Sequence, residues 1–135
     1  TKKAGVVVMG SSTYKTIGQP LKERLNIVYS KNQTFPDVEM TNKSPIELIT
    51  DLENRGFKEV AICGGSHIYT MFMKAAVVDY VYLTIEPVLF GKGMTIFNDD
   101  LKYSLKLQSS QVSESTGTLL LEYKVDYSGT PKMKD

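Results

Sequence analysis

The sequence predicts an α/β fold with a mostly parallel sheet and a C-terminal antiparallel hairpin. Short apolar runs alternate with amphipathic helical stretches along most of the chain, a pattern typical of parallel strands joined by helices. Two of these runs lead directly into glycine and then into a helical stretch. Near the end, residues 105–112 and 118–127 flank the turn Ser115-Thr116-Gly117, which predicts a hairpin.

Length and composition indicate one globular unit. The 135 residues are 41% hydrophobic and 23% charged, which is enough apolar content for a core without metal or disulfide support. We expect a single domain over residues 1–127 and a flexible tail over residues 128–135.

Charge and residue usage exclude several classes of protein. The 16 Lys and Arg residues nearly balance the 15 Asp and Glu residues, and no basic stretch interleaved with aromatics indicates a nucleic-acid surface. One cysteine and one histidine cannot form an internal disulfide or a structural zinc site. No apolar run has the length of a membrane span. We therefore expect a cytoplasmic protein without metal, membrane or nucleic-acid partners.

The first half of the chain contains strands separated by a short helix and a capped helix. Residue 44 is a serine at the expected N-cap, followed by Pro45 at the first helical position and Glu47 at the third, and Gly56 marks the stop. Four apolar residues are expected on one face of that helix, namely Ile46, Leu48, Ile49 and Leu52. The other expected elements are strands over residues 4–9, 25–30 and 38–40 and a helix over residues 13–17.

The second half begins with an expected strand over residues 60–63. A helix over residues 66–74 follows it, and then a longer strand over residues 77–86. Together with the terminal hairpin, these elements predict one sheet whose last strands are antiparallel.

Both strand-to-helix junctions with glycine suit an anionic ligand. The segment Gly10-Ser11-Ser12-Thr13 follows the first strand, and Gly64-Gly65-Ser66 follows Ile62-Cys63. Backbone without side chains can approach a ligand closely, and the free N–H groups of a helix start favour phosphate. We expect small hydroxyl residues at the N-caps and convergence of both junctions on one dinucleotide. Neither junction has the spacing of a Rossmann fingerprint or a P-loop.

Several spaced motifs identify a family resemblance over almost the whole chain. They are Val7-Val8-Met9-Gly10-x-x-Thr13-Tyr14-x-x-Ile17-Gly18-x-Pro20-Leu21-x-x-Arg24-x-Asn26-Ile27-Val28, then Ile62-Cys63-Gly64-Gly65 with Tyr69, Leu83-Thr84-Ile85-Glu86-Pro87, and Phe90-Gly91-Lys92-Gly93 with Phe97. This set closely resembles the dihydrofolate reductase family, with its bacterial thermophilic branch and the related reductase domain of riboflavin biosynthesis. The resemblance implies the three-layer sandwich of that family.

The resemblance also implies an activity and a cofactor. Members of this family are oxidoreductases of one-carbon metabolism that transfer hydride from NADPH to C6 of 7,8-dihydrofolate, giving tetrahydrofolate. Dihydrofolate and antifolate-like small molecules are therefore the expected ligands. By similarity, the cofactor would contact residues of both junctions and of the strand end at residue 30. These residues are Gly10, Ser11, Ser12, Thr13, Ser30, Lys31, Cys63, Gly64, Gly65, Ser66, His67, Ile68 and Tyr69.

The resemblance also implies three substrate-binding residues, Ile17, Leu21 and Arg24, and two catalytic residues, Thr84 and Tyr69. Ile17 and Leu21 would line the slot for the aminobenzoyl ring, and Arg24 would hold the α-carboxylate of the glutamate tail. Thr84 would bind the catalytic carboxylate and the pterin through water, with Tyr69 near the nicotinamide. Without the family, the apolar residues would be ordinary core, Arg24 a surface charge and Thr84 a strand former.

The sequence departs from the family in two ways. No counterpart is present for the family's first strand, mobile loop and acidic helix, so we expect an upstream segment, part of the same or another chain, that carries the catalytic acid. Glu86 is a poor substitute because it ends a strand. Ser11 and His67 replace common basic residues, which leaves the preference for NADPH over NADH open, with Lys31 as compensation.

Two alternatives therefore stay open. The chain could be an aminopyrimidine reductase of riboflavin biosynthesis, although Arg24, Ile17 and Leu21 favour a folate tail. It could also be a nucleotide-binding module without catalysis. Monomer and homodimer are both compatible with the sequence.

Overall fold

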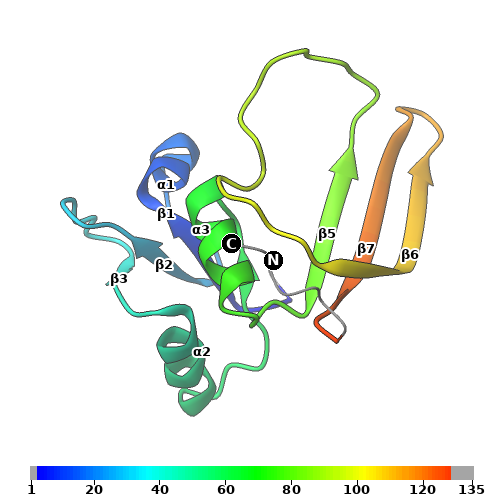
Figure 1. Ribbon diagram of the computed structural model, residues 1–135. Coiled ribbons are helices and arrows are strands. Elements are labelled where there is room, and N and C mark those ends of the chain that lie inside the picture. The colour runs from blue at the N-terminus through cyan, green and yellow to red at the C-terminus, as the bar shows by residue number, and fades with distance from the viewer. Residues whose placement is uncertain (1–2, 129–135) are drawn as a thin grey trace.

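The structure is a computed structural model that describes residues 3–128. Its first sheet contains four parallel strands in the order β3-β2-β1-β4 (Figure 1). They are β1 (Val6–Gly10), β2 (Leu25–Tyr29), β3 (Glu39–Thr41) and β4 (Ala61–Ile62). β1 lies between β2 and β4, and its first four residues are completely buried, as a strand that is apolar on both faces requires.

Three helices cover this sheet on two sides. They are α1 (Ser11–Ile17), α2 (Pro45–Asn54) and α3 (Ser66–Lys74). Because side chains alternate along a strand, Val6 and Val8 of β1 pack against α2 and α3, whereas Val7 and Met9 pack against Tyr14 of α1. The result is three layers, with one core on each face of the sheet. Burial of Phe72, which is 1% exposed, stabilises the larger core by about 2 kcal/mol.

α2 begins as its sequence predicts and has a narrower apolar face. The Ser44 hydroxyl accepts from the amide of Glu47, whose carboxylate accepts from the amide of Ser44, so the capping box is complete. Leu48 and Leu52 are buried, but Ile46 is 60% exposed, which corrects its predicted place on the core face. Residues two apart on a helix point about 200° apart, so Ile46 cannot share the direction of Leu48.

The second sheet is antiparallel and has the order β5-β7-β6. It contains β5 (Tyr80–Ile85), β6 (Ser104–Ser113) and β7 (Thr118–Asp126), with a bulge in β6 between Leu107 and Ser109. The predicted hairpin is therefore present. The expected single sheet is wrong in one respect, because β5 pairs with β7 and not with a parallel strand.

β4 is an edge strand of the parallel sheet, and β5 is an edge strand of the antiparallel sheet. Among residues 3–128, β4 pairs only with β1, and β5 pairs only with β7. A hydrogen bond with Glu122 is the main cause that raises the pKa of Tyr82 on β5, and Glu59, just before β4, adds to it. Figure 1 shows β5 standing apart from the parallel sheet.

Most element boundaries differ from the sequence predictions by one to three residues. The largest change is at the strand expected over residues 77–86, which begins at Tyr80 because residues 75–79 form the turn after α3. Apart from Ser128, the predicted tail lies outside the described residues.

Candidate functional site

The two glycine junctions meet at the carboxyl end of the parallel sheet. The amide of Gly10 donates to the carbonyl of Gly64 at 2.8 Å, and the amide of Cys63 donates to the carbonyl of Val8 at 2.8 Å. Parallel strands end at the same edge of a sheet, so neighbouring β1 and β4 deliver their following turns to one place. The structure thus brings together the two junctions that the sequence singled out.

The caps at these junctions differ from the prediction. Gly10 is the N-cap of α1 and Gly65 is the N-cap of α3, and neither helix has a side-chain cap hydrogen bond. The hydroxyl residues Ser11 and Ser66 are instead the first helical residues. Backbone N–H groups at both helix starts are therefore not used by a capping side chain, which leaves them available to an anion.

Close packing explains why glycines occupy this turn. Gly64 has φ +110°, and a Cβ atom there would lie 3.4 Å from the Tyr69 hydroxyl oxygen. A Cβ atom on Gly10 would lie 3.3 Å from Cγ1 of Ile68. The peptide bond between Gly64 and Gly65 is cis. The turn thus presents bare backbone at the edge of the sheet.

The other predicted residues of the two junctions separate into surface and core. Ser12 and His67 are exposed, and Ser11 and Thr13 are half-buried. Ile68 is 5% exposed and belongs to the core between β1 and α3, so its side chain is not available to a ligand and only its backbone is.

Tyr69 and Cys63 lie beside the turn in a partly dry environment. Burial raises the pKa of the Cys63 thiol and the pKa of the Tyr69 hydroxyl. Both groups therefore stay protonated at neutral pH, so Cys63 behaves as a small apolar residue. The Tyr69 amide donates to the carbonyl of Gly65 at 2.9 Å, which ties the tyrosine to the start of α3.

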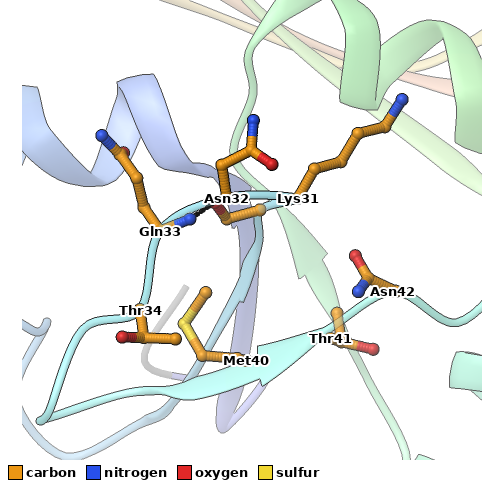
Figure 2. Close-up of a pocket in the computed structure, with 8 residues that line it drawn as sticks. Lys31, Asn32, Gln33, Thr34, Met40, Thr41 and Asn42 are labelled. Carbon is orange, nitrogen blue, oxygen red and sulfur yellow. Dashed lines mark hydrogen bonds between the residues drawn. The ribbon is translucent and has the colours of Figure 1, made fainter.

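A hollow of about 320 Å³ lies at the ends of β2 and β3, on the same edge of the sheet (Figure 2). The predicted residues Ser30 and Lys31 line it, and the Ser30 hydroxyl accepts from the amide of Gln33 at 3.0 Å. Lys31 is exposed at its rim. The complete lining is Ser30, Lys31, Asn32, Gln33, Thr34, Met40, Thr41 and Asn42.

Tyr29 is the last residue of β2 and directly precedes Ser30, the first residue that lines this hollow. Its hydroxyl donates to the carbonyl of Lys43 at 2.7 Å. Burial, with a smaller contribution from Glu47, raises the pKa of Tyr29 to about 12, so the hydroxyl remains a donor at any physiological pH.

The three residues predicted to bind the substrate tail lie between α1 and β2. Ile17 ends α1 and is 36% exposed, Leu21 packs partly against the core beneath α1, and the Arg24 Nε atom donates to the carbonyl of Lys22 at 3.0 Å. Asn26, which is 5% exposed, holds this turn. Its side chain accepts from the amide of Leu21 at 2.9 Å and donates to the carbonyls of Leu21 and Arg24 at 2.8 and 2.9 Å.

Sequence reasoning did not assign that task to Asn26. A polar residue inside the apolar strand 25–29 is a signal for it, because a buried amide requires hydrogen-bond partners.

Thr84 lies on the other sheet. It is exposed on β5 and lines a hollow of about 280 Å³ formed by strands of the antiparallel sheet. Glu86 follows β5, and its carboxylate accepts from the hydroxyl of Thr118 at 3.1 Å. The predicted cofactor residues thus gather on the parallel sheet, while Thr84 is separated from them by the unshared edges of β4 and β5.

Two general features complete the description of residues 3–128. No group of three or more His, Cys, Asp or Glu side chains in this range could hold a metal ion. None of its helices is long and apolar enough to cross a membrane.

Comparison with known families and proteins gives a consistent match. Residues 1–116 match the family model described as dihydrofolate reductase. The dihydrofolate reductase of Haemophilus influenzae is 35% identical over 78 residues, which cover 58% of this chain and 46% of the relative. The type 3 dihydrofolate reductase of Salmonella typhimurium is 35% identical over 82 residues, with the same two coverages. The chain therefore spans about half the length of these relatives.

Solved structures share the fold. A candidate riboflavin biosynthesis protein from Shewanella sp. PV-4 superposes with a TM-score of 0.80 at 22% identity, over 93% of this chain and 76% of that chain. A bifunctional diaminohydroxyphosphoribosylaminopyrimidine deaminase and 5-amino-6-(5-phosphoribosylamino)uracil reductase from Thermotoga maritima gives 0.71 at 18% identity, over 93% of this chain and 46% of that chain. At these identities the likeness establishes the fold alone.

Proposed function

The chain belongs to the dihydrofolate reductase family, and on that premise we propose that it binds NADPH at its joined glycine junctions and takes part in the reduction of 7,8-dihydrofolate. The observation that carries the proposal is the contact between Gly10 and Gly64, which places two helix starts and a bare glycine turn at one edge of the sheet. A dinucleotide has the extended, multiply charged form that such an arrangement suits.

The residues present fit that cofactor. A side chain at Gly10 or Gly64 would meet Ile68 or Tyr69, so the turn keeps the open backbone that a pyrophosphate requires. The helix starts at Ser11 and Ser66 would hold the pyrophosphate, and Ser12, Thr13 and His67 would flank it. When bound, NADPH supplies the hydride that reduces the substrate.

Lys31 and Ser30 would hold the 2′-phosphate of the cofactor in the hollow shown in Figure 2. An ammonium group serves as a point charge for a phosphate dianion. Because Ser11 replaces a common basic residue of the family, Lys31 would supply most of the discrimination between NADPH and NADH.

The first prediction concerns this discrimination. Lys31→Ala should raise the dissociation constant for NADPH by about tenfold, the loss of one charged contact, and leave that for NADH unchanged. The exposed Lys58, which lies between α2 and β4, provides a matched charge deletion. Fluorescence titration of both variants with both cofactors measures the effect. An equal loss for NADPH and NADH would contradict the assignment of Lys31.

On the substrate side, Ile17, Leu21 and Arg24 would bind the aminobenzoyl-glutamate part, with Arg24 on the carboxylate, and Thr84 would bind the pterin end. Asn26 supports this assignment because it holds the turn that carries both Leu21 and Arg24. Thr84 lies on the second sheet, so this substrate site includes the space between β4 and β5.

We further propose that the active protein has an extended segment in that space, together with an acidic residue that protonates the substrate. β4 and β5 are edge strands with unpaired backbone groups, which an added strand would satisfy. Within the described residues, Glu86 is an unsuitable acid, because its carboxylate is engaged by Thr118 at the end of the hairpin.

The decisive experiment follows absorbance at 340 nm with NADPH and each of two substrates. Dihydrofolate turnover supports the proposal, and its loss in Arg24→Lys supports the carboxylate contact, since lysine cannot bind bidentately. Turnover of a ribosylaminopyrimidine phosphate instead would favour the riboflavin-type reductase that the fold neighbours resemble. NADPH binding without turnover of either substrate would indicate a cofactor-binding unit that lacks its acid.

A further inference from the structure

The long connection between β5 and β6 is fastened to one stripe of α3. Figure 1 shows this connection arching from β5 toward the helix and back to β6. On α3, Ser66, Thr70 and Lys74 are four residues apart and share one face. Each holds one residue of segment 95–99. The Ser66 hydroxyl donates to the carbonyl of Thr95 at 2.5 Å, the amide of Asn98 donates to the Thr70 hydroxyl at 3.0 Å, and Lys74 pairs with the carboxylate of Asp99.

Thr70 is the buried member of this stripe. It is 5% exposed, and its hydroxyl also donates to the carbonyl of Ser66 at 2.8 Å. One hydroxyl thus uses its hydrogen for the helix and a lone pair for the connection. A valine of nearly the same shape would leave the Asn98 amide without this partner.

The fastened segment carries Phe97, which supports Tyr69. Their ring centroids are 6.4 Å apart at an interplanar angle of 68°, an edge-to-face contact. Tyr69 in turn lies against Gly64, with its hydroxyl oxygen 3.4 Å from the Cβ position of that glycine. A continuous set of contacts therefore leads from Thr70 to the glycine turn.

Residues of the same connection that precede segment 95–99 are exposed and are not held by α3. Leu89 is 100% exposed, Phe90 is 84% exposed and Met94 is 90% exposed, so residues just before the segment do not pack on the helix. Residues 95–99 are the part of the connection that α3 holds, and they include Phe97, whose ring contacts Tyr69.

We propose that Thr70 is a positioning residue for the dinucleotide site. By holding segment 95–99 it keeps Phe97 against Tyr69, and Tyr69 over the Gly64 turn. The nature of the ligand rests on the proposed function, whereas the positioning of Tyr69 does not. Thr70 is buried and acts through Phe97 and Tyr69 without touching the cofactor.

The test compares Thr70→Val, which removes the hydroxyl, with Thr70→Ser, which keeps it. Thr70→Val should raise the dissociation constant for NADPH by about fivefold, the effect of one lost buried hydrogen bond, and Thr70→Ser should bind as the unmodified chain does. Thr16→Val is the matched control, because the Thr16 hydroxyl makes the same bond to the carbonyl of Ser12 at 3.1 Å on an exposed face of α1. If Thr70→Val bound NADPH as tightly as Thr70→Ser and Thr16→Val do, the proposal would be overturned.

A measurement without cofactor separates this proposal from the proposed function. The ring resonances of Tyr69 and the amide resonances of Gly64 and Gly65 should shift in Thr70→Val and return in Thr70→Ser. Phe97→Leu, which retains apolar volume, should reproduce the Tyr69 shift if Thr70→Val does not fold. Unchanged Tyr69 and glycine signals would overturn the positioning role. Failure of the unmodified chain to bind NADPH would overturn only the ligand, and the Tyr69 signals would still decide the role of Thr70.

Discussion

At the scale of single residues, the site depends on what is absent at position 64. Gly64 combines a positive φ of +110° with the Tyr69 hydroxyl oxygen at 3.4 Å from its Cβ position. The backbone conformation disfavours a side chain at this position, and a Cβ atom would lie in van der Waals contact with Tyr69. The same absence leaves backbone groups open at the sheet edge, so folding and ligand binding place the same demand on this residue.

Gly64→Ala should therefore reduce both stability and cofactor affinity. Forcing a Cβ into this backbone region should lower the free energy of unfolding by about 1 to 3 kcal/mol. Gly93→Ala is the matched control, because nothing lies within 4 Å of its Cβ position and its φ is ordinary. Urea unfolding of both variants checks this. A Gly64→Ala protein as stable as the unmodified chain would show that the turn relaxes easily.

Cys63 gives a second prediction at this scale. Burial raises the pKa of its thiol, so less of the reactive thiolate is present at a given pH than in the unfolded chain. Reaction with a disulfide reagent at pH 8 should be roughly tenfold slower in the native protein than in denaturant. Bound NADPH should slow it further if the cofactor covers the turn. A native thiol that reacts at the unfolded rate would contradict the partly buried position of Cys63.

At the scale of elements, α2 shows how a local signal predicts a boundary. Ser44, Pro45 and Glu47 specify the start of this helix through contacts within four residues, and the structure has the complete capping box. The carboxyl ends of β1 and β4 were predictable for the same reason, since Gly10 and Gly64 mark them. The meeting of the two junctions follows from parallel pairing of β1 and β4.

Elements that depend on distant partners were not predictable in this way. β5 is apolar enough for either sheet, and its pairing with β7 is decided by contacts far apart in the sequence. The hydrogen bonds of Asn26 and Thr70 also depend on which loops lie next to them. The periodicity of apolar residues in the sequence does not predict this. The prediction for Ile46 was wrong because this residue was placed on the core face of α2 for being apolar, without regard to its spacing from Leu48 and Leu52.

The capping box of α2 carries a prediction about stability and pH. Hydrogen bonds from Ser44 lower the pKa of the Glu47 carboxyl. A carboxyl whose pKa is lower in the folded state stabilises the protein above its unfolded pKa, and this stabilisation is lost as the pH falls through the folded value. Ser44→Ala should therefore lower the free energy of unfolding at neutral pH by about 1 kcal/mol.

The Ser44→Ala protein should also lose less stability than the unmodified chain when the pH is lowered below the pKa of an ordinary glutamate. Thermal unfolding across this range measures the difference. Thr50→Ala, at an exposed position inside α2, controls for a general effect of substitution in the helix. Parallel curves for Ser44→Ala and the unmodified chain would show that the Ser44 hydroxyl contributes nothing to the pH dependence.

At the scale of the whole molecule, the chain consists of two sheets whose nearest strands do not pair. The parallel sheet holds both glycine junctions, and the antiparallel sheet holds Thr84. Substrate and cofactor residues of the proposed reaction thus belong to different sheets. A segment that joined the edges of β4 and β5 would bring them into one continuous sheet, which links the completeness of the fold to the completeness of the site.

Hydrogen exchange can test the state of these edges residue by residue. The amide of Val125 donates to the carbonyl of Asp79, so alternation in an antiparallel pair directs the amides of Tyr80, Tyr82 and Thr84 away from β7. In residues 1–135 alone, we expect these three amides to exchange about a hundredfold faster than those of Val81 and Leu83.

Addition of a segment that completes the site should slow the three outward amides to the rate of their neighbours and leave the inward ones unchanged. Exchange at two protein concentrations is the control, because pairing with a second copy would protect the outward amides only at the higher one. Equal protection of all five amides at low concentration would contradict an open β5 edge. The cofactor residues and Thr84 would then already be joined within this chain, and the proposed additional segment would be unnecessary.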